Sequence, residues 1–185
     1  MAVPHPLDQW LSYRDRVPLE VTALSSIPAA DELHQWHDAD LRVLAAVATL
    51  DEAYARADAG GSGDDAEIDR LHQKIDLVLD LLATLVRGLR SHAAEVPVLL
   101  SKEGLAWPQS WLDLAVGSWV RVELELHPSA PQRLVWAAEV VAHQDGEVCA
   151  KFLTPPEALD AALERYVFRR HRRSVAEARS PAGKP

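Results

Sequence analysis

Residues 119–127 read Trp-Val-Arg-Val-Glu-Leu-Glu-Leu-His, and this stretch decides the fold of the second half of the chain. Its apolar side chains fall at every second position, which is the period of a half-buried β-strand. The same period returns in residues 133–142. Asp145-Gly146, a dipeptide favoured in tight hairpin turns, then leads into a further alternating stretch at residues 148–152. These residues predict an antiparallel sheet.

Two shorter alternating stretches, residues 94–100 and 105–107, precede this region. Five short strands joined by turns within about 60 residues favour a small antiparallel β-barrel. A helix is predicted to follow, because Thr154 can cap it and the Pro-Pro-Glu sequence after it suits a first helical turn. The apolar stripe of this helix would be Leu159, Leu163, Tyr166 and Val167.

The region ahead of the barrel has the period of helices. A first helix is predicted over residues 28–58, and it ends before the glycine-rich residues 60–63. A second is predicted over residues 65–91, where Asp64 and Glu67 can form a capping box. Its apolar positions alternate in spacing between three and four residues, which is the heptad pattern of coiled coils. They are Ile68, Leu71, Ile75, Val78, Leu82, Leu85 and Leu89.

This heptad stripe has two interpretations. Leu79, Leu81 and Val86 widen it, which favours either an assembly of more than two helices or a second helix packed alongside. The stripe could therefore join several copies of the chain, or pack on residues 28–58 of the same chain. We expect self-association, because the two helices together carry more apolar surface than one hairpin can easily bury.

Composition narrows the class of protein. The chain has 185 residues, 48% hydrophobic and 25% charged, as is ordinary for a soluble globular protein. Its net charge of −9 is uneven, since residues 31–80 are acidic and residues 150–185 are basic. This excludes a uniformly basic nucleic-acid-binding protein. A single cysteine, Cys149, excludes an intramolecular disulfide and a multi-cysteine zinc site.

The sequence contains no apolar run of bilayer length, and its first residues lack the features of a signal peptide. We therefore expect a cytoplasmic protein with no membrane insertion. There is also no Gly-x-Ser-x-Gly turn, and residues 60–63 lack the lysine of a phosphate-binding loop. His34, His37, Asp38 and Asp40 are better explained as a solvated acidic helix face than as metal ligands. We expect neither catalytic residues nor a metal.

Three motifs of the second half resemble the PilZ domain family. Residues 101–105 (Ser-Lys-Glu-Gly-Leu) resemble the Ser-x-x-Gly-hydrophobic part of its (Asp/Asn)-x-Ser-x-x-Gly motif. Residues 117–124 resemble the G-x-x-V-x-V-x-L strand that follows, and residues 163–170 resemble the closing helix. The resemblance covers residues 94–175 and implies a small β-barrel followed by a helix. Typical members of the family bind the bacterial second messenger cyclic di-GMP.

The chain departs from the family's ligand motifs. Leu99 stands where the first motif has Asp or Asn, and the second motif, R-x-x-x-R, is replaced by Arg87 and Arg90 in R-x-x-R spacing. Ser101 and Gly104 retain part of the first motif. Arginine suits guanine edges and phosphates, so its spacing matters for this ligand. We expect these four residues to bind cyclic di-GMP weakly or not at all, and we expect no cofactor.

An atypical subset of the family lacks both motifs, carries a heptad helix ahead of the barrel and assembles as tetramers. The resemblance to that subset implies a non-enzymatic bacterial regulatory protein that forms a homo-oligomer, for which we expect a tetramer. Such a protein would act through protein–protein interaction in the control of motility, pili or virulence. One alternative is a true cyclic di-GMP receptor with a non-standard site. Another is a nucleic-acid-associated protein that uses the C-terminal arginines.

Two features are candidates for contact with an unidentified protein partner. One is Trp111, and the other is the basic end of the last helix, with Arg169, Arg170, Arg172 and Arg173. Such a cluster could neutralise nucleic-acid phosphates, contact an acidic partner or the chain's own acidic helices, or be a solvated helix end favoured by the helix dipole. Nucleic acid is the least favoured of these.

The predicted fold class is α+β, with long N-terminal helices forming a coiled-coil stalk, then a small antiparallel PilZ-like β-barrel and a C-terminal helix. Four regions are expected. They are an extended N-terminal arm (1–30), a helical hairpin or coiled-coil oligomerisation region (31–92), the barrel with its closing helix (93–175) and a disordered tail (176–185).

Overall fold

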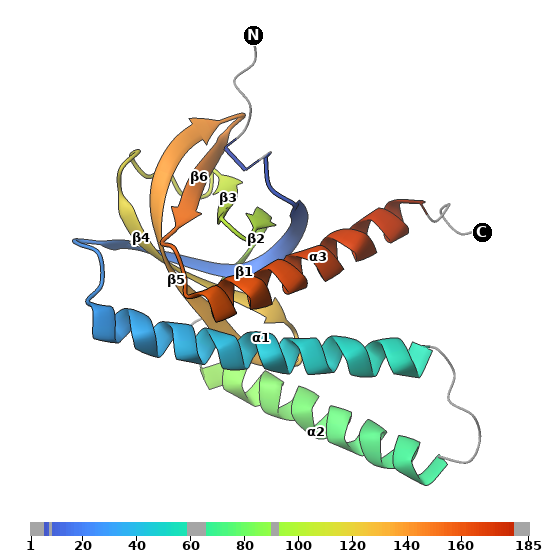
Figure 1. The fold of residues 1–185 in the computed structure, drawn as a ribbon. Helices are drawn as coiled ribbons and strands as arrows, with labels where there is room; N and C mark the ends of the chain where they lie inside the picture. The colour runs from blue at the N-terminus through green and yellow to red at the C-terminus, as the bar shows by residue number, and fades with distance from the viewer. Residues whose placement is uncertain (1–5, 8, 59–65, 90–92, 180–185) are drawn as a thin grey trace.

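The computed structural model describes residues 6–7, 9–58, 66–89 and 93–179 (Figure 1). In chain order the elements are β1 (Ser12–Leu24), α1 (Ala30–Asp58), α2 (Ala66–Leu89), β2 (Ala94–Ser101), β3 (Gly104–Pro108), β4 (Trp119–His127), β5 (Ala130–Gln144), β6 (Glu147–Phe152) and α3 (Glu157–Arg179). The strands form a closed antiparallel barrel in the order β1-β2-β3-β6-β5-β4. The predicted antiparallel barrel and C-terminal helix are therefore confirmed.

The first strand corrects the interpretation of the N-terminal region. β1 pairs with β2 along Ser12–Leu19 and changes partner at Leu19 to pair with β4 as far as Leu24. Residues 12–24 are thus a barrel strand, and the barrel does not begin at residue 93. Residues 17–23 do alternate, since apolar Val17, Leu19, Val21 and Ala23 are separated by Pro18, Glu20 and Thr22. The proline-rich composition of residues 1–30 masks this signal, and both partner strands lie far away in the sequence.

The other five strands lie where the alternating stretches predicted them. Asp145 and Gly146 form the turn between β5 and β6, with φ angles of 53° and 77°. Positive φ at both central residues is what a two-residue hairpin turn of type I′ requires. The Asp-Gly dipeptide therefore sets the register between these two strands.

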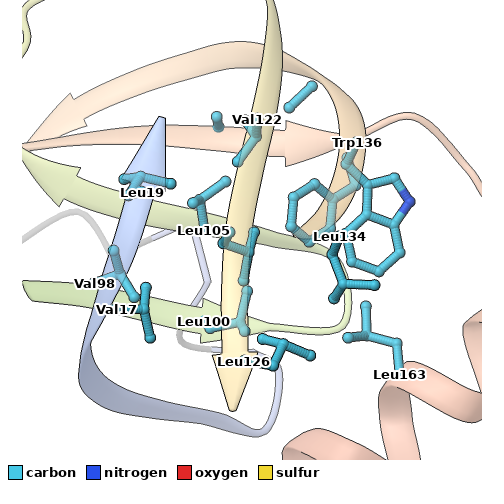
Figure 2. Packing of buried hydrophobic residues seen from close by; sticks show 14 of the residues in the cluster. Val17, Leu19, Val98, Leu100, Leu105, Val122, Leu126, Leu134, Trp136 and Leu163 are labelled. Atoms are coloured by element: carbon cyan, nitrogen blue, oxygen red, sulfur yellow. The ribbon is translucent and has the colours of Figure 1, made fainter. Parts of the chain in front are cut away.

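The inside of the barrel is filled by the alternating apolar side chains. Figure 2 shows Leu100, Leu105 and Leu134 pointing toward the same interior. The rings of Trp136 and Phe152 stack there with centroids 4.5 Å apart. Burial of such side chains contributes about 1.5–3 kcal/mol each, so this interior is the main source of stability.

Two helices close the barrel. Val43, Leu44 and Val47 of α1 join the same buried cluster as the predicted stripe of α3, and Leu163 is directed toward Leu134 (Figure 2). α3 continues to Arg179, which corrects the prediction of disorder from residue 176. Residues 180–185 lie outside the described residues.

α1 also hydrogen-bonds to the part of β5 that extends beyond its pairing with β6. The backbone N–H of Val135 in β5 donates a hydrogen bond to Asp40 Oδ1 at 2.9 Å. Asp40 is fully buried, and its Oδ2 has no hydrogen-bond partner among the described residues. Burial raises the pKa of this carboxyl to about 7, although the hydrogen bond from Val135 opposes the shift.

α1 and α2 lie where helices were predicted, and the glycine-rich residues 60–63 fall outside the described residues. In Figure 1, the C-terminal end of α2 lies beside β5, while the N-terminal half of α2 points away from the barrel. Within the described part of the chain, no helix combines the length and the apolar character needed to cross a membrane.

Candidate functional site

The largest apolar surface that the described chain leaves uncovered lies on α2. Five of the seven predicted heptad positions have described side chains, and these are between 47% and 61% exposed. They are Leu71, Ile75, Val78, Leu82 and Leu85. Leu77 and Leu81 are exposed beside them, at 60% and 61%. The side chains of Ile68 and Leu89 lie outside the description. We call the seven exposed residues, which are Leu71, Ile75, Leu77, Val78, Leu81, Leu82 and Leu85, the α2 face.

α2 is attached to the rest of the chain by its opposite side. Ala83 is buried, and Asp80 Oδ1 accepts a hydrogen bond of 2.7 Å from the hydroxyl of Ser129, in the turn between β4 and β5. The heptad positions of the α2 face with described side chains are therefore about half exposed on the side of the helix that faces away from this attachment. An exposed patch of this kind is typical of an interaction site.

The Ser-x-x-Gly part of the ligand motif forms a tight turn between β2 and β3. The buried hydroxyl of Ser101 accepts hydrogen bonds from the N–H groups of Glu103 and Gly104, both at 3.2 Å, and donates to the Gly104 carbonyl at 3.1 Å. A Cβ on Gly104 would overlap the carbonyl oxygen of Ala150 in β6. The turn therefore requires a hydroxyl at residue 101 and a glycine at residue 104 for its own structure, whether or not a ligand binds.

Leu99, at the Asp/Asn position of the motif, belongs to a second apolar cluster. It packs with Leu7, Ala106 and Cys149, all buried, and the N-terminal segment supplies Leu7. Burial raises the pKa of the Cys149 thiol to about 11, so this cysteine is a packed, protonated side chain. Apolar packing thus takes the place of a hydrogen-bond acceptor at this position.

The two arginines of the motif fall where the structure describes no side chains, so their predicted roles stay predictions. Arg87 belongs to α2, although its side chain is not described, and Arg90 lies outside the described residues. β2 runs from the end of α2 to the Ser101 turn, which places the two regions at opposite ends of that strand. The cation at the turn is Lys102, whose Nζ lies 3.4 Å from Asp160 Oδ2 and 3.5 Å from Glu164 Oε2 on α3.

The predicted arginines of α3 have different environments. Arg169 Nε lies 3.8 Å from Asp51 Oδ2 on α1. Arg170 donates to the Tyr166 hydroxyl at 3.1 Å and to the Leu126 carbonyl at 2.9 Å. Arg172 and Arg173 are exposed. Half of the predicted cluster therefore holds α3 to the rest of the chain, and the other half faces outward.

Arg170 belongs to a network at the end of the barrel. The Tyr13 hydroxyl of β1 donates to the Tyr166 hydroxyl at 3.1 Å, and the two rings meet edge to face at 6.1 Å. Burial raises the pKa of both phenols, so they remain protonated donors. The network connects the first strand to the last helix.

Trp111 lies in the segment between β3 and β4 and is 37% exposed. Together with Leu112, Val21 and Ala94 it lines a shallow cavity of about 380 Å³. Its side chain is therefore accessible at the surface, and its role as a partner contact stays a prediction.

Sequence reasoning missed Phe168, which is 50% exposed on α3. A signal was present, because Phe168 falls outside the stripe formed by Leu159, Leu163 and Tyr166. The prediction that Asp40 belongs to a solvated helix face is wrong, because Asp40 is buried against β5 and accepts the N–H of Val135, a contact that only the fold brings about. In the described ranges, no three His, Cys, Asp or Glu side chains gather as a metal site.

Two comparisons with known proteins give a match. The family model described as "Atypical PilZ domain, cyclic di-GMP receptor" matches residues 41–180. A crystal structure of a pathogenic protein from Xanthomonas campestris has a similar fold, with a TM-score of 0.70 and 24% identity over 91% of this chain and 92% of that one. It is described as a new tetrameric PilZ domain, self-assembled via an unusual helical bundle. No curated protein matches.

Proposed function

Because the chain belongs to the atypical PilZ family, we propose that it is a non-enzymatic regulatory protein whose barrels are held together through the α2 face. The carrying observation is the exposure of this face, at positions that repeat with heptad spacing. An exposed leucine buried in an interface contributes about 1.5–3 kcal/mol, so several such residues per chain supply a strong driving force.

A tetramer is the assembly that this surface fits best. Leu77 and Leu81 extend the apolar surface beyond the heptad positions, and a wide apolar arc favours bundles of more than two helices over a dimer. The similar structure from Xanthomonas campestris is described as a tetramer built through a helical bundle, which supports the same arrangement here.

The proposed role is the presentation of several barrels to a partner protein in the control of motility, pili or virulence, in the bacterial cytoplasm. Barrels fixed to one helical bundle act as a multivalent surface. Multivalency raises the overall affinity for a partner without a single strong site. The polar and aromatic residues outside the bundle, such as Trp111, are then the contacts that select the partner.

The test is the solution mass by multi-angle light scattering. Wild type should have a mass near four times 20.4 kDa. The double variant Leu71→Glu/Leu82→Glu should be monomeric, because each glutamate would have to be buried in the bundle. The control is Leu11→Glu/Val116→Glu, which makes the same chemical change at exposed positions outside the helices and should keep the wild-type mass. A monomeric wild type would contradict the proposal.

A second candidate function is reception of cyclic di-GMP, which the description of the family model names. The packing of Leu99 and the structural use of the Ser101 hydroxyl are arguments against tight binding. Isothermal titration of cyclic di-GMP into wild type and into Arg87→Ala/Arg90→Ala tests whether the chain is a receptor. Heat that is present in wild type and lost in the variant would support a receptor, and its absence in both would remove this candidate.

A further inference from the structure

The outward side of α3 carries an aromatic residue that the described chain does not cover. Phe168 is 50% exposed, whereas its neighbours Tyr166 and Val167 are each 1% exposed. Tyr166 and Val167 belong to the core face of the helix, so Phe168 points to the other side.

Two arginines flank this ring. Arg165 and Arg172 are three residues before and four residues after Phe168, which puts them on the same helix face. Both are exposed, and neither forms an ion pair within the part of the chain that the structure describes. The Arg172 guanidinium lies 5.8 Å from the centre of the Phe168 ring. We call Arg165, Phe168 and Arg172 the Phe168 patch.

The composition of this patch indicates a protein partner. Aromatic residues and arginine are the types that carry most binding energy at protein interfaces. Two cations with no carboxylate partner among the described residues are complementary to a segment that bears negative charge. The neighbouring Arg169 and Arg170 are engaged within the chain and do not add to the patch.

The same features argue against nucleic acid. The patch has only two cations, and Glu164 is exposed next to Arg165. Nucleic-acid binding draws its affinity from the neutralisation of many phosphates, and this surface offers too few cations for that.

We propose that the Phe168 patch docks an acidic segment of a partner protein. An aromatic or large aliphatic side chain of that segment packs on Phe168, and carboxylates on either side of it pair with Arg165 and Arg172. This inference rests on the proposed function, in which the barrels act through a protein partner, and it names the chemistry of that partner.

The test uses the full chain and a fluorescein-labelled peptide of the sequence Glu-Asp-Glu-Phe-Leu-Glu-Asp-Glu, followed by fluorescence anisotropy at low salt. Wild type should bind it saturably. Phe168→Ala should bind at least about tenfold more weakly, as expected for loss of a central aromatic contact. Arg165→Glu/Arg172→Glu should lose the acidic peptide and instead bind a twin in which lysine replaces every acidic residue.

Three controls isolate the patch. Lys151→Glu removes an exposed cation of β6 and should leave the affinity of the acidic peptide unchanged. A peptide with serine in place of both apolar residues should bind wild type at least about tenfold more weakly. The light-scattering mass of each α3 variant should equal that of wild type. A peptide that fails to bind an intact tetramer therefore overturns this inference alone.

Three results would overturn the inference. The first is an acidic peptide that does not bind, or that binds Phe168→Ala and the charge-reversed variant as well as wild type. The second is a twelve-nucleotide oligothymidine that binds more tightly than the peptide and loses affinity in the same variants. The third is a fall in mass caused by Phe168→Ala, which would make the patch a contact between copies of the chain.

Discussion

Asp40 shows how one buried carboxyl couples the fold to pH. It substitutes for a neighbouring strand by accepting the N–H of Val135, yet it is fully buried and only one of its two oxygens has a described partner. Burial raises its pKa to about 7, well above the ordinary value of 3.8. The folded state therefore binds this proton more tightly than the unfolded state, and stability from this residue falls as the pH rises through 7.

We expect the substitution Asp40→Asn to remove this dependence. The amide keeps an oxygen for the Val135 N–H but carries no charge at any pH. Between about pH 7.5 and pH 5, the free energy of unfolding of wild type should rise by about 2–3 kcal/mol relative to that of Asp40→Asn. Urea titrations at each pH measure this difference. Asp38→Asn, on the exposed side of the same helix, should behave as wild type, and a flat difference for Asp40→Asn would refute the assignment.

The Ser101 turn makes a second prediction at this scale. Ser101→Ala removes the acceptor of two backbone N–H groups and should lower the free energy of unfolding by about 1–3 kcal/mol. Gly104→Ala should destabilise further, because its methyl group would overlap the Ala150 carbonyl. Ser110→Ala, at an exposed position before β4, is a suitable control. If Ser101→Ala and Gly104→Ala both kept the wild-type stability, the hydrogen bonds of Ser101 and the close packing of Gly104 would not be what stabilises the turn.

At the scale of elements, α3 is one of the two helices that close the barrel. Leu163 lies in the common core next to Leu134, so Leu163→Ala should lower the free energy of unfolding by about 2–5 kcal/mol through lost burial and the remaining cavity. Arg165→Ala, on the outward side of the same helix, should change it by less than about 0.5 kcal/mol. Chemical denaturation followed by tryptophan fluorescence measures both. Similar effects of the two variants would contradict the described orientation of α3.

The elements that the sequence predicted are those whose signal is local. The alternation along β4 and the Asp145-Gly146 turn follow from neighbouring residues, and both were found as predicted. β1 was not predicted as a barrel strand, because the prolines of residues 1–30 mask the alternation of residues 17–23, and its partners β2 and β4 lie beyond two intervening helices. A residue pattern cannot report a partner that only the folded chain supplies.

The candidate site divides in the same way. Heptad spacing identified five of the seven residues of the α2 face. Spacing is equally compatible with packing inside one chain, and only the exposure of residues such as Leu71 and Leu82 favours a surface. The Ser-x-x-Gly pattern resembles a ligand motif and also makes a stable turn, so the residue types could not separate the two roles. The predicted roles of Arg87 and Arg90 stay predictions.

At the scale of the whole molecule, assembly and folding are linked in the proposed oligomer. The free energy of unfolding of a single chain is small, and association adds a stabilisation that grows with protein concentration. The midpoint of thermal unfolding of wild type should therefore rise by roughly 2–4 °C for each tenfold increase in concentration. Differential scanning calorimetry over a hundredfold range measures this. The midpoint of Leu71→Glu/Leu82→Glu should not depend on concentration, and a constant midpoint for wild type would argue for a monomer.

The partner exchange of β1 also has a kinetic consequence. β1 leaves the ribosome first, but β2 and β4 follow only after both long helices have been synthesised at about 5–20 residues per second. The barrel therefore has a high contact order and cannot close until β6 has been synthesised, which places its folding in the slow range of milliseconds to seconds. For the whole of that interval the edge of β1 is unpaired, and translation speed sets how long the nascent chain needs protection from aggregation.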